Sequence, residues 1–215
     1  PDKYIGDLET WDRAEATLRR VLERRFGAGN YHVHEGDGAF YGPKIDILMH
    51  DALERDWQMG TIQLDFQLPR RFNLSYVDHN GQPQTPVVIH RVIYGSMERF
   101  IGLLIEHYAG AFPLWISPVQ AAIIPITDRH IPYAEAVNRQ LKAAGLRSEV
   151  DGRSERMAAK IRDWQLQKVP YMLVAGDREA TAGTVAVRTR AGADLGPQDV
   201  GAFIARCQDE VAAKA

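Results

Sequence analysis

The chain has 215 residues and a formal net charge of −2, with 45% of its residues hydrophobic and 25% charged. These values are typical of a soluble globular protein with one large or two small domains. No apolar run approaches the roughly 20 residues that a membrane-spanning helix needs. The single cysteine excludes an intrachain disulfide and any metal site with two cysteines from this chain. Since the N-terminus shows no signal-peptide pattern either, these features predict a cytoplasmic protein.

The first 114 residues predict a helix, then antiparallel strands, then a second helix. Apolar residues at helical spacing define the helices, and apolar residues that alternate with polar ones define the strands. Asn80-Gly81 indicates a hairpin or a long loop between Tyr76-Val77 and residues 87–89. The predicted helices cover residues 8–26 and 96–110, and the predicted strands cover residues 31–34, 45–50 and 57–67.

The pattern changes near Pro113 and Pro118, after which strands and helices alternate. This alternation predicts an α/β domain with a mixed, mostly parallel sheet that is covered on both faces. Residues 115–215 carry 14 Lys and Arg against 12 Asp and Glu, so they are not a basic arm that binds nucleic acid by charge alone. The predicted strands cover residues 119–127, 147–150, 169–176 and 184–189, and the predicted helices cover residues 133–144, 155–167 and 197–213.

Arg99 stands in the first turn of the helix predicted over residues 96–110. A cation there opposes the helix dipole, while the free N–H groups of a first turn attract anions. The position therefore favours an anion held between backbone and guanidinium, which binds phosphate through two hydrogen bonds. Gly95 and Gly102 leave room for such a ligand. The alternative is a surface arginine paired with a nearby glutamate, which contributes little.

Several other positions are open to two interpretations. His90 ends an apolar strand, where a lone histidine is most often a hydrogen-bonded core residue. Tyr41 and Lys44 lie in GDGAFYGPK, which is either a glycine-rich turn or a place where a substrate approaches the backbone. Gln58 and Gln63 could simply be the solvent-facing polar residues of a strand in which polar and apolar residues alternate.

Four segments in this order resemble threonyl-tRNA synthetases, a class II aminoacyl-tRNA synthetase family. They are EGDGAFYGPKIDI, WQMGTIQLDFQLPRRFNLSYV, VIHRVIYGSMERFIGLLIEHYAG and VPYMLVAGDREATAGTVAVRTRAG. The resemblance covers nearly the whole chain. It implies an α+β portion of a catalytic domain with an antiparallel sheet over residues 1–114. An α/β anticodon-binding domain over residues 115–215 is expected to follow it.

The resemblance also implies roles in threonine activation. Arg99 is expected to bind the γ-phosphate of ATP, and Lys44 to stabilise developing charge at the reacting groups. His90 is expected to be one of three zinc ligands, the other two lying upstream, while Mg²⁺ accompanies ATP. Ser96 is first a helix N-cap and second an ATP contact. The remaining candidates are Gln58 and Thr61 for ATP, and Tyr41 and Gln63 for threonine.

In the second domain the resemblance implies contacts with tRNA(Thr). Glu179 and Arg188 are the candidate anticodon readers, since bases of a single-stranded loop are read on their edges by such groups. Lys168 and Arg190 are candidate phosphate contacts, and for these two a solvated surface is nearly as good an explanation. The implied assembly is a homodimer.

Members of this family are far longer than 215 residues, and the chain opens just after their second class II signature. We therefore expect a C-terminal portion of a threonine–tRNA ligase that is inactive by itself. The alternative is a non-catalytic paralogue or split subunit that binds tRNA or a partner. Tyr41, Lys44, His90 and Arg99 argue against it, because a pure binding module has no use for them.

Overall fold

The computed structural model describes residues 4–214 and divides into two compact units. The N-terminal unit is Pro1–Leu104 and the C-terminal unit is Ile105–Ala215. The division falls inside a helix near the predicted domain boundary between residues 114 and 115, which stays a prediction. No helix among the described residues is long and apolar enough to cross a membrane.

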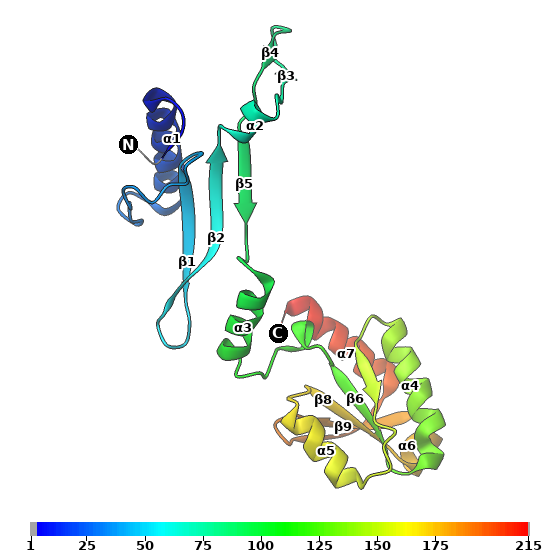
Figure 1. The fold of residues 1–215 in the computed structure, drawn as a ribbon. Helices are drawn as coiled ribbons and strands as arrows, with labels where there is room; N and C mark the ends of the chain where they lie inside the picture. Colours follow the sequence, from blue (N-terminus) through cyan, green and yellow to red (C-terminus); the bar gives the residue numbers. More distant parts are fainter. Residues whose placement is uncertain (1–3, 215) are drawn as a thin grey trace. The chain divides into compact units, whose positions relative to one another are not determined.

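The N-terminal unit is built on a three-stranded antiparallel sheet in the order β1-β2-β5 (Figure 1). The helix before it begins at Asp7, whose Oδ1 accepts a hydrogen bond from the Thr10 amide at 2.7 Å, and ends at Gly27. The strands are β1 (Lys44–His50), β2 (Asp56–Asp65) and β5 (Val88–Val92), with a small hairpin of β3 (Tyr76–Val77) and β4 (Pro83–Gln84). The helices are α1 (Leu8–Phe26), α2 (Leu68–Arg71) and α3 (Met97–His107).

The predictions for this unit hold for both long helices and for β1 and β2. The strand predicted over residues 31–34 is wrong: the backbone there is irregular and exposed, because no described strand lies beside it to satisfy its hydrogen bonds. The turn at Asn80-Gly81 does join a hairpin, but Tyr76 pairs with Gln84. Residues 87–89 instead lead into β5, which pairs with β2.

The C-terminal unit contains a five-stranded sheet in the order β10-β9-β8-β6-β7. β6 pairs in parallel with β7 and β8, whereas β8–β9 and β9–β10 are antiparallel. The sheet is mixed, as predicted, but its parallel share is one half. The strands are β6 (Ala121–Pro125), β7 (Ser148–Val150), β8 (Tyr171–Ala175), β9 (Thr184–Thr189) and β10 (Asp194–Asp199). The helices are η1 (Leu114–Ile116), η2 (Asp128–His130), α4 (Ile131–Ala143), α5 (Met157–Leu166), α6 (Asp177–Ala182) and α7 (Val200–Ala213).

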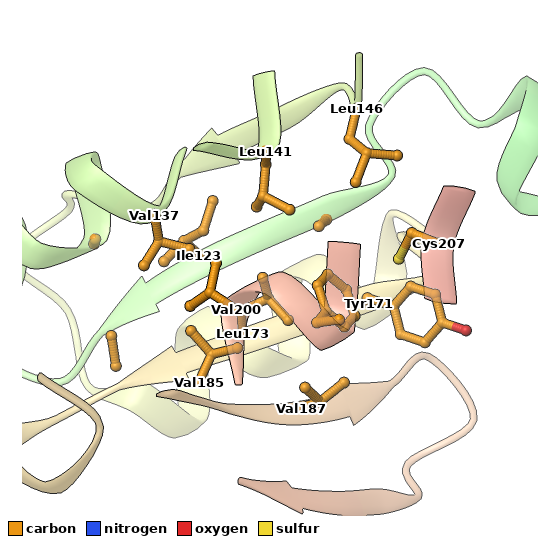
Figure 2. Close-up of a cluster of buried hydrophobic side chains, with 14 of the residues drawn as sticks. Ile123, Val137, Leu141, Leu146, Tyr171, Leu173, Val185, Val187, Val200 and Cys207 are labelled. Carbon is orange, nitrogen blue, oxygen red and sulfur yellow. The ribbon is translucent and has the colours of Figure 1, made fainter. Parts of the chain in front are cut away.

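Helices cover both faces of this sheet, as predicted. Successive residues of β6 point to opposite faces: Ile123 packs with α4 and α7, and Ile124 packs with α5. Figure 2 shows the first cluster, in which Leu141 of α4 and Val200 of α7 approach the sheet beside Leu173. Each buried apolar side chain of this kind stabilises the fold by about 1.5–3 kcal/mol.

Four elements of this unit were not predicted, and two of them are the short 3₁₀ helices η1 and η2. The strand β10 contains Gly196 and Pro197, which are rare in central strands, but β10 is an edge strand that pairs only with β9. The last helix therefore starts at Val200 and not at Pro197. Asp199 is its N-cap, and its Oδ1 accepts a hydrogen bond from the Ala202 amide at 3.0 Å. The short helix α6 lies between β8 and β9 and ends at Gly183 with φ +70°.

Candidate functional site

Polar side chains gather on one face of the N-terminal sheet. Thr61, Gln63 and Asp65 alternate along β2 and so share a face. In the strand register, Gln63 lies opposite Lys44 of β1 on one side and opposite His90 of β5 on the other. Three separated sequence segments thus bring the candidate ATP, threonine and zinc residues onto one surface.

Tyr41 reaches this face because the chain before β1 continues the pairing with β2. The Leu64 amide donates to the Pro43 carbonyl at 3.0 Å, and the Phe66 amide donates to the Tyr41 carbonyl at 3.2 Å. A Cβ atom at Gly42 would lie 1.9 Å from the Leu64 carbonyl oxygen, so only glycine permits this approach. Gly42 therefore allows the backbone of this segment to approach β2 closely, which brings Tyr41 beside Gln63.

Hydrogen bonds connect Tyr41 with two of the other candidates. The Tyr41 hydroxyl donates to Oε1 of Gln63, and Nε2 of Gln63 donates to Oγ1 of Thr61 at 3.2 Å. The Tyr41 ring also packs edge-on against the ring of His90, with the centroids 5.8 Å apart. The amide of Gln63 is thus fixed at both ends, which orients it on the polar face.

Asp46 connects the candidate catalytic residue Lys44 with the candidate ATP contact Gln58. Its Oδ2 accepts a hydrogen bond from Nζ of Lys44 at 2.7 Å, and its Oδ1 accepts one from Nε2 of Gln58 at 2.6 Å. The hydrogen bond to Asp46 raises the pKa of Lys44 above its usual value and outweighs partial burial, which acts the other way. Lys44 is therefore held protonated.

His90 lies beside a buried carboxylate. Its Nε2 is 2.8 Å from Oδ2 of Asp65, whose side chain is fully buried. Burial opposes the charge of Asp65, but hydrogen bonds from His90 and from the amides of Leu68 and Gln67 outweigh it, so the pKa of the carboxyl lies below its usual range. His90 is half-buried, and its Nδ1 makes no hydrogen bond with the described residues.

The described residues contain no cluster of three His, Cys, Asp or Glu side chains that could hold a metal ion. His90 nevertheless fits the part of a single ligand, since a metal-binding imidazole commonly donates its second N–H to a carboxylate. A zinc ion at this place needs its other ligands from beyond the described residues.

Arg99 is held by two contacts that orient its guanidinium. Its Nη1 donates to the Gln58 carbonyl at 3.1 Å, and its Cζ lies 5.4 Å from the centroid of the Trp57 ring. Trp57 is fixed in turn, since its Nε1 donates to Oδ2 of Asp51 at 2.8 Å. The Arg99 amide donates to Oγ of Ser96 at 3.2 Å, so Ser96 caps α3 as predicted.

The two glycines beside Arg99 differ in what surrounds them. Gly95 has φ +64°, and a Cβ there would lie 3.4 Å from the carbonyl oxygens of Gln58 and Met59, so it serves the packing of the chain against β2. A Cβ at Gly102 would meet nothing within 4 Å. Of these two glycines, Gly102 is the one with open space beside its backbone.

The structure places the two candidate anticodon readers at different ends of the C-terminal sheet. Glu179 lies in α6, just beyond the carboxyl end of β8, and its Oε2 accepts a hydrogen bond from the Gly176 amide at 2.9 Å. Arg188 pairs with Met172 near the opposite end of β8, because β9 is antiparallel to β8. Its Nη2 donates to Oδ2 of Asp194 at 2.9 Å.

Lys168 and Arg190 lie together at the loop after α5. Nη1 of Arg190 donates to the carbonyl of Phe112 at 2.5 Å and to that of Lys168 at 3.4 Å. Arg190 thus has a structural role in joining two loops. A phosphate contact would have to use the same guanidinium group. Lys168 has φ +61°, and its side chain is exposed.

Sequence reasoning missed Asp46, Asp65 and Trp57. A signal existed for Asp65, because it continues the alternation of Thr61 and Gln63 and so falls on the same face of β2. No sequence signal pointed to Trp57 or to its partner Asp51, since their contact depends on how the β1–β2 turn folds.

Two family models match the chain. The model for the tRNA synthetase class II core domain (G, H, P, S and T) matches residues 6–108, and the model for an anticodon binding domain matches residues 120–210. The first match includes the polar face and Arg99. The second match includes the five-stranded sheet with Glu179 and Arg188.

Curated relatives and solved structures agree with these models. The threonine–tRNA ligase of Symbiobacterium thermophilum is 54% identical over 216 residues, and that of Desulforamulus reducens is 54% identical over 211 residues. These alignments cover 100% and 98% of this chain but 33% of each relative, so the chain spans about a third of their length.

The crystal structure of the RNA binding domain of threonyl-tRNA synthetase from Cryptosporidium parvum is similar, with a TM-score of 0.86 and 40% identity. The match covers 98% of this chain and 53% of that one. The putative threonyl-tRNA synthetase ThrRS-1 from Aeropyrum pernix has a TM-score of 0.66 and 28% identity, over 99% of this chain and 52% of that one. With both domain types matched in order, the chain belongs to the threonyl-tRNA synthetase family of class II aminoacyl-tRNA synthetases.

Proposed function

We propose that the chain is part of a threonine–tRNA ligase, which activates threonine with ATP and transfers it to tRNA(Thr). The observation that carries this proposal is the polar face of the N-terminal sheet. Tyr41, Lys44, Gln63 and His90 come from three strand segments and still meet on one surface. A domain that only bound tRNA would gain nothing from this arrangement, so the face favours a ligase over a non-catalytic module.

ATP would bind at the end of the face near Arg99. The guanidinium has five N–H donors, and the Gln58 carbonyl and the Trp57 ring hold it without neutralising its charge. Arg99 is thus oriented to bind the γ-phosphate of ATP, with Mg²⁺ accompanying the nucleotide. Ser96, Gln58 and Thr61 are the further ATP contacts. Lys44 would stabilise charge that develops on the reacting groups, a task for which its contact with Asp46 keeps it protonated.

Threonine would bind beside His90. Zinc held by His90 and by two ligands from another segment would supply open coordination positions for the amino and hydroxyl groups of threonine. The residues of this chain would orient the substrate there: Tyr41 and Gln63 are joined by a hydrogen bond and lie next to His90. A site built around the substrate hydroxyl rejects valine, which lacks that group.

The C-terminal unit would bind the anticodon arm of tRNA(Thr). We propose Glu179 and Arg188 as base readers and Lys168 and Arg190 as phosphate contacts. Since Glu179 and Arg188 lie toward opposite ends of β8, they would contact different nucleotides of the loop. We further propose a cytoplasmic homodimer, with residues 1–114 and 115–215 as the catalytic and anticodon-binding portions.

A chimera tests the catalytic part of the proposal. In the Symbiobacterium thermophilum ligase, the segment that aligns with this chain is replaced by this chain, and amino acid-dependent ATP–pyrophosphate exchange is measured. We expect exchange with threonine and not with valine. Arg99→Ala should abolish exchange, while the matched control Arg13→Ala, an exposed arginine of α1, should leave it unchanged. Exchange with another amino acid, or none with threonine, would contradict the proposal.

A further inference from the structure

Asp65 is a buried carboxylate whose two oxygens are both engaged. Oδ1 accepts hydrogen bonds from the amides of Gln67 at 2.8 Å and Leu68 at 3.0 Å. Oδ2 faces Nε2 of His90 at 2.8 Å. The side chain has no measurable exposure, so water does not compete for either oxygen. The backbone donors fix Asp65, and Asp65 in turn fixes the ring beside it.

This contact determines where the proton of a neutral His90 ring lies. An ionised carboxylate only accepts hydrogen bonds, so the nitrogen that faces it carries the proton. A neutral imidazole has one N–H, which leaves the lone pair on Nδ1. No hydrogen bond among the described residues engages that nitrogen, and the Tyr41 ring lies against the same ring. Nδ1 is therefore the nitrogen that can bind a cation.

We infer that Asp65 is a positioning residue, which holds His90 in the Nε2–H tautomer so that Nδ1 is the nitrogen that binds the metal. The metal part of this inference rests on the proposed function. The tautomer part does not, since it follows from the contacts of Asp65 alone. Asp65 touches neither ATP nor threonine in this account and acts only through His90.

Two other Asp–His contacts among the described residues show what is particular to this one. His50 faces Asp56 through Nδ1 at 2.6 Å, but both side chains are more than half exposed, so water can replace either partner. His130 faces Asp177 through Nε2 at 2.9 Å, but its Nδ1 also contacts Thr127 at 3.1 Å. Of these contacts, only that of His90 joins a buried carboxylate to a ring whose second nitrogen is available.

The substitution Asp65→Asn changes the tautomer with almost no change in shape. The atom near the amides of Gln67 and Leu68 must remain an oxygen, because an NH₂ group there would face two donors. The NH₂ group of asparagine therefore takes the place of Oδ2 and donates to Nε2 of His90. Nε2 must then accept, and the proton moves to Nδ1, which loses its lone pair for a metal.

The tautomer can be measured on the 215-residue chain by ¹⁵N NMR of the imidazole nitrogens. Spectra are recorded at about pH 9, well above the ordinary histidine pKa of about 6.5, and His90 is assigned from the signals lost in His90→Gln. We expect a protonated Nε2 and an unprotonated Nδ1 in the unaltered chain, and the reverse in Asp65→Asn. A protonated Nδ1 in the unaltered chain would overturn the inference, even if the variant failed to fold. A well-folded variant with the original tautomer would also overturn it.

Asp56→Asn is the matched control, since it removes the carboxylate of the exposed Asp–His contact in the same unit. It should alter the signals of His50 and leave those of His90 unchanged; a change of tautomer at His90 would show that the effect is not specific to Asp65.

The metal part is tested by zinc affinity of the chimeric ligase, measured by competition with a chelator. Asp65→Asn should weaken zinc binding by about 10- to 100-fold, and unchanged affinity would overturn the assignment of Nδ1. Because this readout needs no amino acid activation, a chimera that binds zinc but does not activate threonine would contradict the proposed function alone.

Discussion

The two units differ in how many of their apolar side chains are buried. The C-terminal unit packs apolar clusters against both faces of its sheet, with Ile123, Leu173 and Phe203 among its fully buried residues. In the described part of the N-terminal unit, the buried hydrophobic residues are Trp11, Ala14 and Met59. Its sheet exposes apolar side chains instead, including Ile47, Leu48, Met49, Ile89 and Val92.

The comparison indicates that a regular sheet does not by itself make a stable unit. Both sheets have clear registers, so hydrogen bonding does not separate them. Apolar burial does, because it supplies most of the favourable free energy of folding. We therefore expect the C-terminal unit to unfold cooperatively and the N-terminal unit to open more easily, with its ordered contacts concentrated on the polar face.

The largest expected effect concerns Cys207, the single cysteine of the chain, which lies in the C-terminal core. Burial, with a smaller contribution from Glu210, raises the pKa of its thiol to about 12, and the thiolate is the reactive form. Labelling by a thiol reagent should be at least about 10³-fold slower in the native chain than in the unfolded chain, as in a stable domain. In Cys207→Ser, an added Ala205→Cys on the exposed side of α7 should react freely. Rapid labelling of Cys207 would show that this unit is as open as the other.

Next in size is the effect of truncating a buried aromatic side chain. Phe203→Ala should lower the free energy of unfolding of the C-terminal unit by about 3–5 kcal/mol, because it removes a fully buried ring and leaves a cavity. The matched change Phe72→Ala in the N-terminal unit, where the ring is 68% exposed, should cost no more than about 0.5 kcal/mol. Urea unfolding followed by circular dichroism measures both. Equal costs would remove the contrast between the units.

Substitution of Arg188 tests whether the C-terminal unit also contacts the bases of the tRNA. Its contact with Asp194 is partly exposed and contributes little to stability, whereas loss of a base contact should weaken tRNA(Thr) binding by about 1–3 kcal/mol. Filter binding of Arg188→Ala is compared with Arg139→Ala, an exposed arginine of α4. Similar weakening by both would indicate binding by charge alone.

The smallest expected effect is a dependence of stability on acid in the C-terminal unit. Hydrogen bonds from Arg153, supported by Trp164 and opposed by burial, lower the pKa of Asp151. The unfolded chain therefore takes up this proton first, so the contribution of Asp151 is present above the ordinary pKa of about 3.9 and is lost as the pH falls through the lower folded value. Melting temperatures between about pH 5 and pH 2 should fall less steeply for Asp151→Asn. An equal slope would assign the acid sensitivity to other groups.

Much of the fold could be predicted from the sequence because its signals are local. Apolar periodicity marks α1 and α3, and alternation of apolar and polar residues marks β1 and β2. In the second half, the alternation of strand and helix patterns indicates the α/β unit. Each of these patterns can be read from a short stretch of sequence. The edge strand β10 could not be predicted, since Gly196 and Pro197 argue against a strand and only the pairing with β9 overrides them.

In the candidate site, Arg99 could be singled out from the residues alone, because a cation is unusual at a helix start. His90 was singled out only by the family resemblance, since a lone histidine at the end of an apolar run is most often a hydrogen-bonded core residue. Asp46 and Trp57 could not be predicted, because their importance lies in contacts with Gln58 and Arg99, which are distant in the chain and which no spacing in the sequence reveals. The separation of Glu179 from Arg188 was missed for the same reason, since it depends on the antiparallel direction of β9.

The proposed function requires that the C-terminal unit reads the anticodon of tRNA(Thr) and that the polar face of the N-terminal unit belongs to the catalytic site. Its most direct test is a binding competition with the 215-residue chain, between tRNA(Thr) and the same tRNA with its anticodon bases replaced. We expect the unaltered tRNA to bind at least about tenfold more tightly, which corresponds to a difference of about 1.4 kcal/mol in binding free energy. Equal affinity for the two RNAs would contradict it.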